Sequence, residues 1–342
     1  MLYERLCDLP LTVERYELEP LRLDTQNFVR HSTVVHLHGP AGTGSGEDIT
    51  YSPESQLDFQ QQGRTLALAG DWTVESFSRR LDGLDLRTRT DDDHAAPLHR
   101  RWAFESAALD LALRQAGKSL GEALGRTPKP LTFSVSLGLG RLETVRSRYP
   151  DARFKVDLAE NWTEETVDML AALGCVDVVD LKGQYRGSFK GPGADPDQYR
   201  WIAEKLPEVW LEDPWLDDAT RPVLAPHKER ITWDATLHAV ADILQCEHPP
   251  RCVNIKPSRF GFVSELMRTY EYCEGRGIEM YGGGQFELGV GRGQIQLLAA
   301  LFHPETPNDV APSAYNDADL RDDLPVSPLA EVAAPVGFRG QS

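Results

Sequence analysis

The fold is decided by four short apolar runs: VDVVDLKG (176–183), VWLEDPW (209–215), RITWDAT (230–236) and CVNIKPSRFG (252–261). Each run leads to a charged residue, in turn Asp180, Glu212, Asp234 and Lys256. The intervals between these residues are 32, 22 and 22 positions, about one strand plus one helix each. Because a parallel crossover needs a dozen or more residues, this spacing predicts parallel strands that lie side by side.

Such strands place three carboxylates and one lysine at the same level, at the carboxyl ends of the strands. Active sites of βα barrels lie at that end. Three hard oxygen ligands facing one cavity suit Mg²⁺, and an ammonium group on the next strand can carry out proton chemistry beside it. A single charged residue at a strand end is more often part of a surface salt bridge, but the ordered series favours a metal site.

Length and composition limit the class of protein. The 342 residues accommodate a barrel of about 250 residues and a smaller domain. The formal net charge of −17 argues against a nucleic-acid partner, since phosphate binding needs a basic face. Five scattered cysteines indicate a reducing compartment. The sequence has no visible signal peptide and no run of about 18 apolar residues. We therefore expect a cytoplasmic protein without a membrane partner.

Residues 1–127 are expected to form an α+β domain that caps the barrel. VERYELEPL (13–21) and STVVHLHG (32–39) have the composition of strands. Residues 40–57, rich in Gly, Ser, Asp and Pro, are expected to be a loop. A broad apolar face over 101–124 predicts a helix.

The barrel is predicted over residues 128–319, and residues 320–342 are expected to return to the first domain. The strand candidates are 131–138, 153–158, 176–181, 209–213, 231–235, 253–257, 278–287 and a segment within 309–316. Helices are expected over 140–148, 163–174, 196–206, 236–245, 262–276 and 291–302. Eight strand candidates in this rhythm favour a closed barrel over an open sheet.

Lys155 at the end of the second predicted strand gives the site a second side. Strands two and six of an eight-stranded barrel are opposite, so Lys155 and Lys256 would face each other with the carboxylates between them. A divalent cation on a substrate carboxylate stabilises the enediolate that forms when the α-proton leaves. One lysine can then act as base and the other as acid. Glu287 could orient Lys256, accept a proton or only cap the next helix.

Nine segments carry a resemblance to a known family, in the same order along nearly the whole chain. They are RHSTVVHLHG (30–39), GE (46–47), RRWAFESAALDLALRQAGKSLGEALGR (100–126), ARFKVDLAE (152–160), VVDLKG (178–183), WLEDP (210–214), TWDAT (232–236), VNIKPSRFG (253–261) and GGGQFELGVG (282–291). The chain resembles members of the enolase superfamily, most closely the muconate-lactonizing-enzyme and o-succinylbenzoate-synthase-like subgroup.

The resemblance implies an α/β architecture: a (β/α)7β TIM-like barrel with an α+β N-terminal capping domain completed by the C-terminal segment. It implies one Mg²⁺ held by three ligands, Asp180, Glu212 and Asp234. Lys155 and Lys256 become the acid/base pair, and Arg153 takes the place of the first lysine of the family's Lys-x-Lys strand. Two residues depart from the pattern. Lys182 replaces an asparagine, which brings a cation near the metal, and Ala235 replaces a glutamate.

The implied reaction is metal-dependent abstraction of a proton α to the carboxylate of a small molecule. The outcome can be syn-dehydration as in o-succinylbenzoate synthases, racemisation or epimerisation as in N-acylamino-acid racemases, or cycloisomerisation. The two departures motivate an alternative, a carboxylate-binding barrel with a weakened or lost metal site and little catalysis. The family's specificity loops correspond to about 20–30 and 50–62, which contain Asn27, Phe28, Tyr51 and Gln56. Substrate identity and a homo-oligomeric state stay open.

Overall fold

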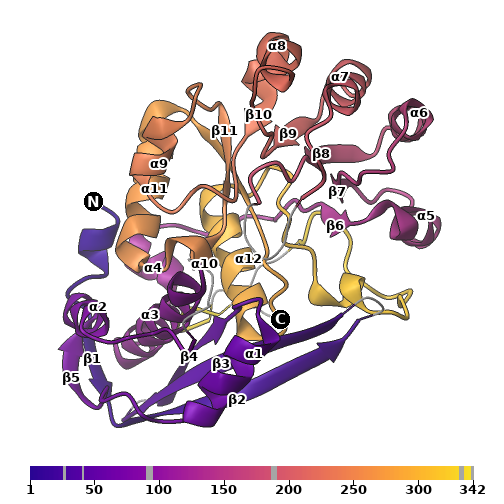
Figure 1. Cartoon of the computed structure of the whole chain (residues 1–342). Helices are drawn as coiled ribbons and strands as arrows, with labels where there is room; N and C mark the ends of the chain where they lie inside the picture. The colour runs from indigo at the N-terminus through magenta and orange to yellow at the C-terminus, as the bar shows by residue number, and fades with distance from the viewer. Residues whose placement is uncertain (26–27, 41, 90–94, 186–190, 331–334, 340–342) are drawn as a thin grey trace.

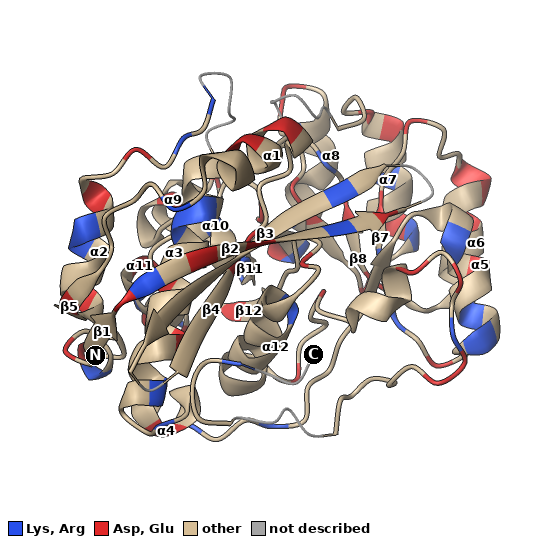
Figure 2. Ribbon diagram, turned by 90° about the horizontal axis from the view of Figure 1, so that it is seen from below, with Lys and Arg blue, Asp and Glu red and all other residues tan. Residues whose placement is uncertain are grey.

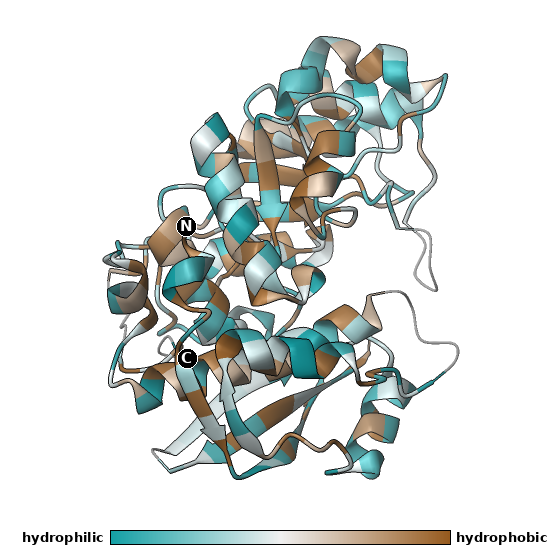
Figure 3. Ribbon diagram, turned by 90° about the vertical axis from the view of Figure 1, so that its left-hand side faces the viewer, coloured by the Kyte–Doolittle hydropathy of each residue, from teal (hydrophilic) through white to brown (hydrophobic). Residues whose placement is uncertain are grey.

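The computed structural model describes residues 1–25, 28–40, 42–89, 95–185, 191–330 and 335–339. An N-terminal α+β part precedes a part in which parallel strands alternate with helices (Figure 1). Figure 3 shows these two parts one above the other, with mainly hydrophobic residues on the strands between the helices. None of the helices in these ranges is long and apolar enough to cross a lipid bilayer.

The N-terminal part is built on an antiparallel sheet of three strands, β2 (Arg15–Asp24), β3 (Val29–Gly39) and β4 (Gly42–Asp48). A second antiparallel pair joins β1 (Pro10–Val13) to β5 (Gly70–Thr73). A short 3₁₀ helix, Tyr3–Arg5, comes first. The helices are α1 (Pro53–Gln62), α2 (Val74–Asp82), α3 (Ala96–Gln115) and α4 (Leu120–Leu124).

Strand β4 corrects the prediction of a loop over 40–57. Gly44 and Gly46 of this strand allow close packing, because a Cβ atom on Gly44 would lie 2.2 Å from the Ala107 carbonyl oxygen of α3. A Cβ atom on Gly46 would lie 2.2 Å from the Ala103 carbonyl oxygen. Helix α1 then starts inside the predicted loop, since the side chain of Ser52 accepts a hydrogen bond from the Ser55 amide.

The helix predicted over 101–124 is two helices. Gly117, with a φ of +66°, follows the end of α3, and its left-handed backbone breaks the helical path. Ser119 and Glu122 then form a reciprocal capping box at the start of α4. Nearly all of α3 is buried, because it lies between the sheet of the N-terminal part and the barrel helices.

Within the described residues, the second part has seven parallel strands, an arc of five in the order β10-β9-β8-β7-β6 and a pair β11-β12. The strands are β6 (Val135–Leu137), β7 (Phe154–Asp157), β8 (Val176–Asp180), β9 (Trp210–Glu212), β10 (Ile231–Thr232), β11 (Cys252–Ile255) and β12 (Glu279–Gly282). The helices are α5 (Leu139–Arg148), α6 (Glu164–Leu173), α7 (Pro196–Lys205), α8 (Thr220–Leu224), α9 (Val240–Gln245), α10 (Pro257–Phe260), α11 (Val263–Arg276) and α12 (Val290–Phe302), with a 3₁₀ turn η2 (Ala225–Arg230). The predicted parallel α/β arrangement is therefore confirmed.

The strand predicted within 309–316 is not formed as predicted. Single parallel bridges join Phe133 to Asn308 and Gly283 to Asp309, and a 3₁₀ turn, η3 (Ser313–Asn316), follows. Pro312 lies directly before this turn and has no amide proton to donate to a ladder.

The chain end lies against the N-terminal part. The amide of Leu120 donates to the Gly337 carbonyl at 3.1 Å, and the Gly337 amide donates to the Lys118 carbonyl at 2.9 Å. The buried ring of Phe338 packs edge-on against Trp102 of α3. Phe338 therefore contributes to the core against α3.

Candidate active site

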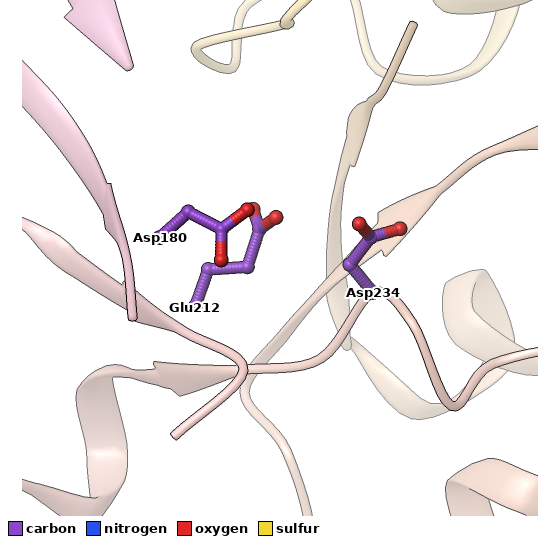
Figure 4. Close-up of side chains that lie close together, drawn as sticks. All are labelled: Asp180, Glu212 and Asp234. Atoms are coloured by element: carbon purple, nitrogen blue, oxygen red, sulfur yellow. The ribbon is translucent and has the colours of Figure 1, made fainter. Parts of the chain in front are cut away.

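Three carboxylates gather at the carboxyl ends of neighbouring strands (Figure 4). Asp180 ends β8, Glu212 ends β9, and Asp234 lies two residues after β10. All three are fully buried, and one oxygen from each lies within 4.8 Å of the others. The register pairs Asp180 with Glu212, which explains their common level. Three buried carboxylate oxygens at this spacing can hold a divalent metal ion.

The two predicted lysines contact this cluster from different strands. Lys155 of β7 donates to Glu212, and its Nζ lies 3.7 Å from Asp180 Oδ2 and 3.6 Å from Asp309 Oδ2. Lys256 directly follows β11, and its Nζ lies 2.8 Å from Asp234 Oδ2. Both lysines line one cavity.

A third lysine also contacts the cluster. Lys182 Nζ lies 2.6 Å from Asp180 Oδ2 and 3.1 Å from Asp157 Oδ1. Arg259 adds a fourth cation, with its Nε 3.1 Å from Asp234 Oδ1. The carboxylates are therefore ion-paired on several sides.

Burial and the neighbouring charges shift the pKa values of the cluster in opposite directions. Burial raises the pKa of Glu212 to about 8, although Lys155 acts in the opposite direction. For Lys155, burial lowers the pKa, but the charges of Glu212, Asp180 and Asp309 raise it well above its usual value.

Against the effect of burial, the charges of Lys182 and Arg259 hold the pKa values of Asp180 and Asp234 below their usual range, so these carboxylates stay charged. Glu212, with its raised pKa, favours an additional proton or cation.

Asp213 was missed by the sequence analysis and takes on a supporting role. Its carboxylate accepts the amide protons of Asp234 and Ala235, both at 2.8 Å. Burial and the nearby Asp234 raise its pKa to about 7. A carboxylate from β9 thus lies beside Ala235, where the family's own pattern has a glutamate. In the sequence, its position directly after Glu212 was the one feature that could have indicated this role.

Two further residues that were missed hold Glu212. Asn254 Nδ2 donates to Glu212 Oε2 at 3.2 Å, and the Tyr281 hydroxyl donates to the same oxygen. Asn254 precedes Lys256 by two positions. Because side chains alternate along a strand, this spacing predicts that both side chains face the same side of the sheet.

Two predicted accessory residues do not contact the carboxylate cluster within the described ranges. Arg153 pairs with Asp177 at the start of β8, and the strand register shifts between Phe154 and Lys155. This irregularity separates Arg153 from Lys155, although they are two positions apart. Glu287 accepts the Gln285 amide proton at 2.7 Å and pairs with Arg292 at 3.1 Å, so it does not orient Lys256.

A cavity of about 410 Å³ lies above the lysines. Its walls come from both parts of the chain, with Thr25, Phe28 and Tyr51 facing Lys155 and Lys256. Figure 2 shows the end of β2 and the start of β3 on the side of strands β7 and β8. The N-terminal part therefore supplies one wall of the cavity, and the parallel strands of the second part supply another.

The specificity residues expected from the sequence divide into three groups. Phe28 and Tyr51 line the cavity. The prediction is wrong for Gln56, which is buried between the Thr33 hydroxyl and the backbone carbonyls of Asp48 and Thr50. Asn27 lies outside the described residues.

Known structures share the fold of this chain. The fold matches a dipeptide epimerase from Enterococcus faecalis with a TM-score of 0.71 at 16% identity, covering 97% of this chain and 100% of that chain. It matches a muconate cycloisomerase from Pseudomonas fluorescens with a TM-score of 0.70 at 17% identity, covering 97% and 96%. These are folds of the enolase superfamily, an α/β barrel with a capping domain.

Sequence comparison defines the family. The chain belongs to the enolase superfamily and, within it, to the family described as Domain of unknown function (DUF8230), whose N-terminal domain matches residues 4–123 and C-terminal domain residues 127–317. An N-succinylamino acid racemase from Thermus thermophilus is 36% identical over 335 residues, 92% of this chain and 86% of that protein. An o-succinylbenzoate synthase from Bacillus subtilis is 25% identical over 230 residues, 64% of this chain and 60% of that protein.

Proposed function

We propose that the protein is a Mg²⁺-dependent lyase or isomerase that removes the proton α to the carboxylate of a small molecule. The observation that carries the proposal is the buried triad Asp180, Glu212 and Asp234, contacted by Lys155 and Lys256 beneath one cavity. Racemisation of an N-succinylated amino acid is the favoured outcome, because the relative that aligns over most of both chains is named for that substrate. Syn-dehydration is the second outcome, because other relatives are named o-succinylbenzoate synthase.

The donor set suits a divalent cation. Asp180 Oδ2 and Asp234 Oδ1 are buried and are approached by cationic groups, Lys182 Nζ at 2.6 Å and Arg259 Nε at 3.1 Å. Hard carboxylate oxygens in a buried cluster that favours positive charge fit Mg²⁺. When bound, the cation would supply positive charge beside the substrate carboxylate, which makes the adjacent C–H more acidic.

The two lysines move the proton. Lys155 and Lys256 approach the cavity from β7 and from the end of β11, so one can accept the α-proton and the other can return a proton to the opposite face. Return on the opposite face inverts the carbon. Asp309, 3.6 Å from Lys155 Nζ, helps to hold that ammonium group in place.

We also propose the finer architecture. A closed (β/α)7β barrel is supported by two hydrogen bonds of the last segment, from the Ser134 amide to the Asn308 carbonyl at 2.8 Å and from the Asp309 amide to the Gly282 carbonyl at 2.7 Å. The proposed domains are a capping domain at 1–127, a barrel at 128–319 and a returning segment at 320–342. We place the protein in the cytoplasm, where its carboxylate substrate would be a metabolite.

A substrate screen tests the function. The purified protein is incubated with each enantiomer of several N-succinylamino acids, with Mg²⁺ or with EDTA, and optical rotation is followed. We expect rotation to decay to zero from either enantiomer with Mg²⁺ and to stay constant with EDTA. A parallel arm supplies the cyclohexadiene precursor of o-succinylbenzoate and measures product absorbance. Turnover in neither arm would contradict the proposal.

The four ion-pairing cations support a second candidate, a barrel that binds a carboxylate ligand without efficient catalysis. Lys182 and Arg259 already contact two of the three carboxylates. In this case calorimetry would show binding of an N-succinylamino acid that EDTA leaves unchanged, and no exchange of the α-proton with solvent.

A further inference from the structure

The ammonium group of Lys182 lies between two carboxylates that differ in burial. Asp180 Oδ2, 2.6 Å away, is fully buried, whereas the side chain of Asp157, 3.1 Å away, is 44% exposed. Asp157 ends β7 and lines the cavity together with Lys182. Lys182 therefore has one partner inside the carboxylate cluster and one partner outside it.

The backbone at Lys182 is anchored by hydrogen bonds, whereas its side chain borders the cavity. The residue has a φ of +55°, which is uncommon for a side chain with a Cβ atom. Its amide donates to Asp180 Oδ1 at 2.9 Å, and the next amide, of Gly183, donates to the Asp213 carbonyl at 2.8 Å. The side chain, in contrast, borders a cavity large enough to receive it.

Two cations cannot share the buried oxygen of Asp180 without repulsion. A divalent ion that binds Asp180 would lie within a few ångströms of the ammonium group, where charges interact strongly because little water screens them. The partially exposed Asp157 offers the ammonium group an ion pair outside the cluster. Both positions lie within reach of the same side chain.

From this arrangement, we propose that Lys182 is a tethered competitor of the metal ion: it pairs with both Asp180 and Asp157 in the metal-free protein and keeps only Asp157 when a divalent cation binds. The inference rests on the proposed function, since it takes Asp180 as a metal ligand. It makes Lys182 the residue that weakens metal affinity and Asp157 the residue that restores part of it. In the metal-bound protein, Lys182 also adds a cation to the cavity wall, where an anionic substrate binds.

Metal affinity, and not activity, tests this inference. Free Mn²⁺ is measured by electron paramagnetic resonance during titration of the wild type, Lys182→Met, Asp157→Asn and the double variant. We expect Lys182→Met to lower the Kd at least tenfold. Asp157→Asn should raise it at least threefold, and should have no effect when Lys182 is already replaced. A purely structural salt bridge would not produce this dependence of one variant on the other.

Lys205→Met is the matched control. Lys205 also lies between two carboxylates, with its Nζ 2.6 Å from Asp168 and 2.7 Å from Glu164, but these residues are on helices α6 and α7 away from the cluster. Its replacement should leave the Kd unchanged. If Lys182→Met does not fold, an unchanged Kd in Asp157→Asn alone overturns the inference.

Different results would overturn the metal site and the competition by Lys182. Equal Mn²⁺ affinity in the wild type and Lys182→Met overturns the competition while leaving the metal site in place. Absence of Mn²⁺ binding in every variant overturns the proposed function and the inference together. Tighter Mn²⁺ binding by Lys182→Met together with weaker Mn²⁺ binding by Asp157→Asn supports both the metal site and the competition.

Discussion

Glu47 of β4 joins the N-terminal part to the start of α12, and its removal should measurably destabilise the protein. Its carboxylate is buried and accepts four hydrogen bonds, one from the Ser32 hydroxyl at 2.7 Å and three from backbone amides at the start of α12. Those amides belong to Leu288, Gly289 and Gly291, at 2.7, 3.0 and 3.0 Å. A carboxylate at a helix N-terminus also interacts favourably with the helix dipole.

The expected loss for Glu47→Ala is about 3 kcal/mol. Hydrogen bonds to a charged group contribute roughly 1.5–3 kcal/mol each, but they are not additive, and the variant also avoids the cost of burying a carboxylate. Burial indeed raises the pKa of Glu47, which reports that cost. With about 2 cal/mol/K of unfolding entropy per residue, a loss of 3 kcal/mol lowers the Tm by roughly 4 °C.

Scanning calorimetry at neutral pH measures the effect. Glu47→Gln keeps the shape and one acceptor oxygen, so its Tm should lie between those of the wild type and Glu47→Ala. The control is Glu14→Ala, since Glu14 is exposed on the N-terminal part. A Tm of Glu47→Ala within 1 °C of this control would refute the reasoning.

Two more predictions concern substrate recognition and pH. Arg141 lines the cavity, donates to the carbonyls of Asn316 and Asp317 at 3.0 and 2.7 Å, and has no acidic partner within the described ranges. Arg141→Ala should therefore raise the KM for an N-succinyl substrate about tenfold, the effect of losing one charged contact to the second carboxylate of the succinyl group. The KM for the N-acetyl analogue, which lacks this carboxylate, should rise less than twofold. Equal effects on the two KM values would contradict a role of Arg141 in binding the second carboxylate. Burial, with the nearby Arg259, holds the pKa of His99 well below its usual value, so the unfolded chain takes up a proton below pH 6.5 that the folded chain does not. The free energy of unfolding therefore falls as pH falls, by about 1.4 kcal/mol per pH unit. In urea titrations, His99→Gln should reduce this loss between pH 6.5 and 5 by about 2 kcal/mol. Equal losses in the wild type and His99→Gln would contradict this effect of His99.

The order of the barrel strands and the carboxylate cluster could be predicted because both depend on local pattern. Asp180, Glu212 and Asp234 follow apolar runs at the spacing of βα units, and parallel strands bring their ends to one level. Lys155 and Lys256 were located by the same reasoning. The positions of these residues follow from the alternation of side chains along each strand and from the order of the strands, and both can be read from the sequence.

Features that depend on contacts between distant segments could not be predicted. The glycines of β4 have the composition of a loop, and only the approach of α3 to Gly44 and Gly46 explains them. The hydrogen bonds of Asp213 to the amides after β10 depend on how two strand ends meet. The burial of Gln56 depends on the packing of α1 against β3. In each case a tertiary contact outweighed the local preference.

The exchange of the α-proton in D₂O tests the central claim most directly. The wild type, Lys155→Ala and Lys256→Ala are incubated with Mg²⁺ and each enantiomer of an N-succinylamino acid that the screen identifies, and deuterium at the α-carbon is measured by NMR. Each lysine variant should lose racemisation, and each should retain exchange of one enantiomer only, the opposite enantiomer in the two variants. Racemisation that persists in both variants would contradict a two-lysine mechanism.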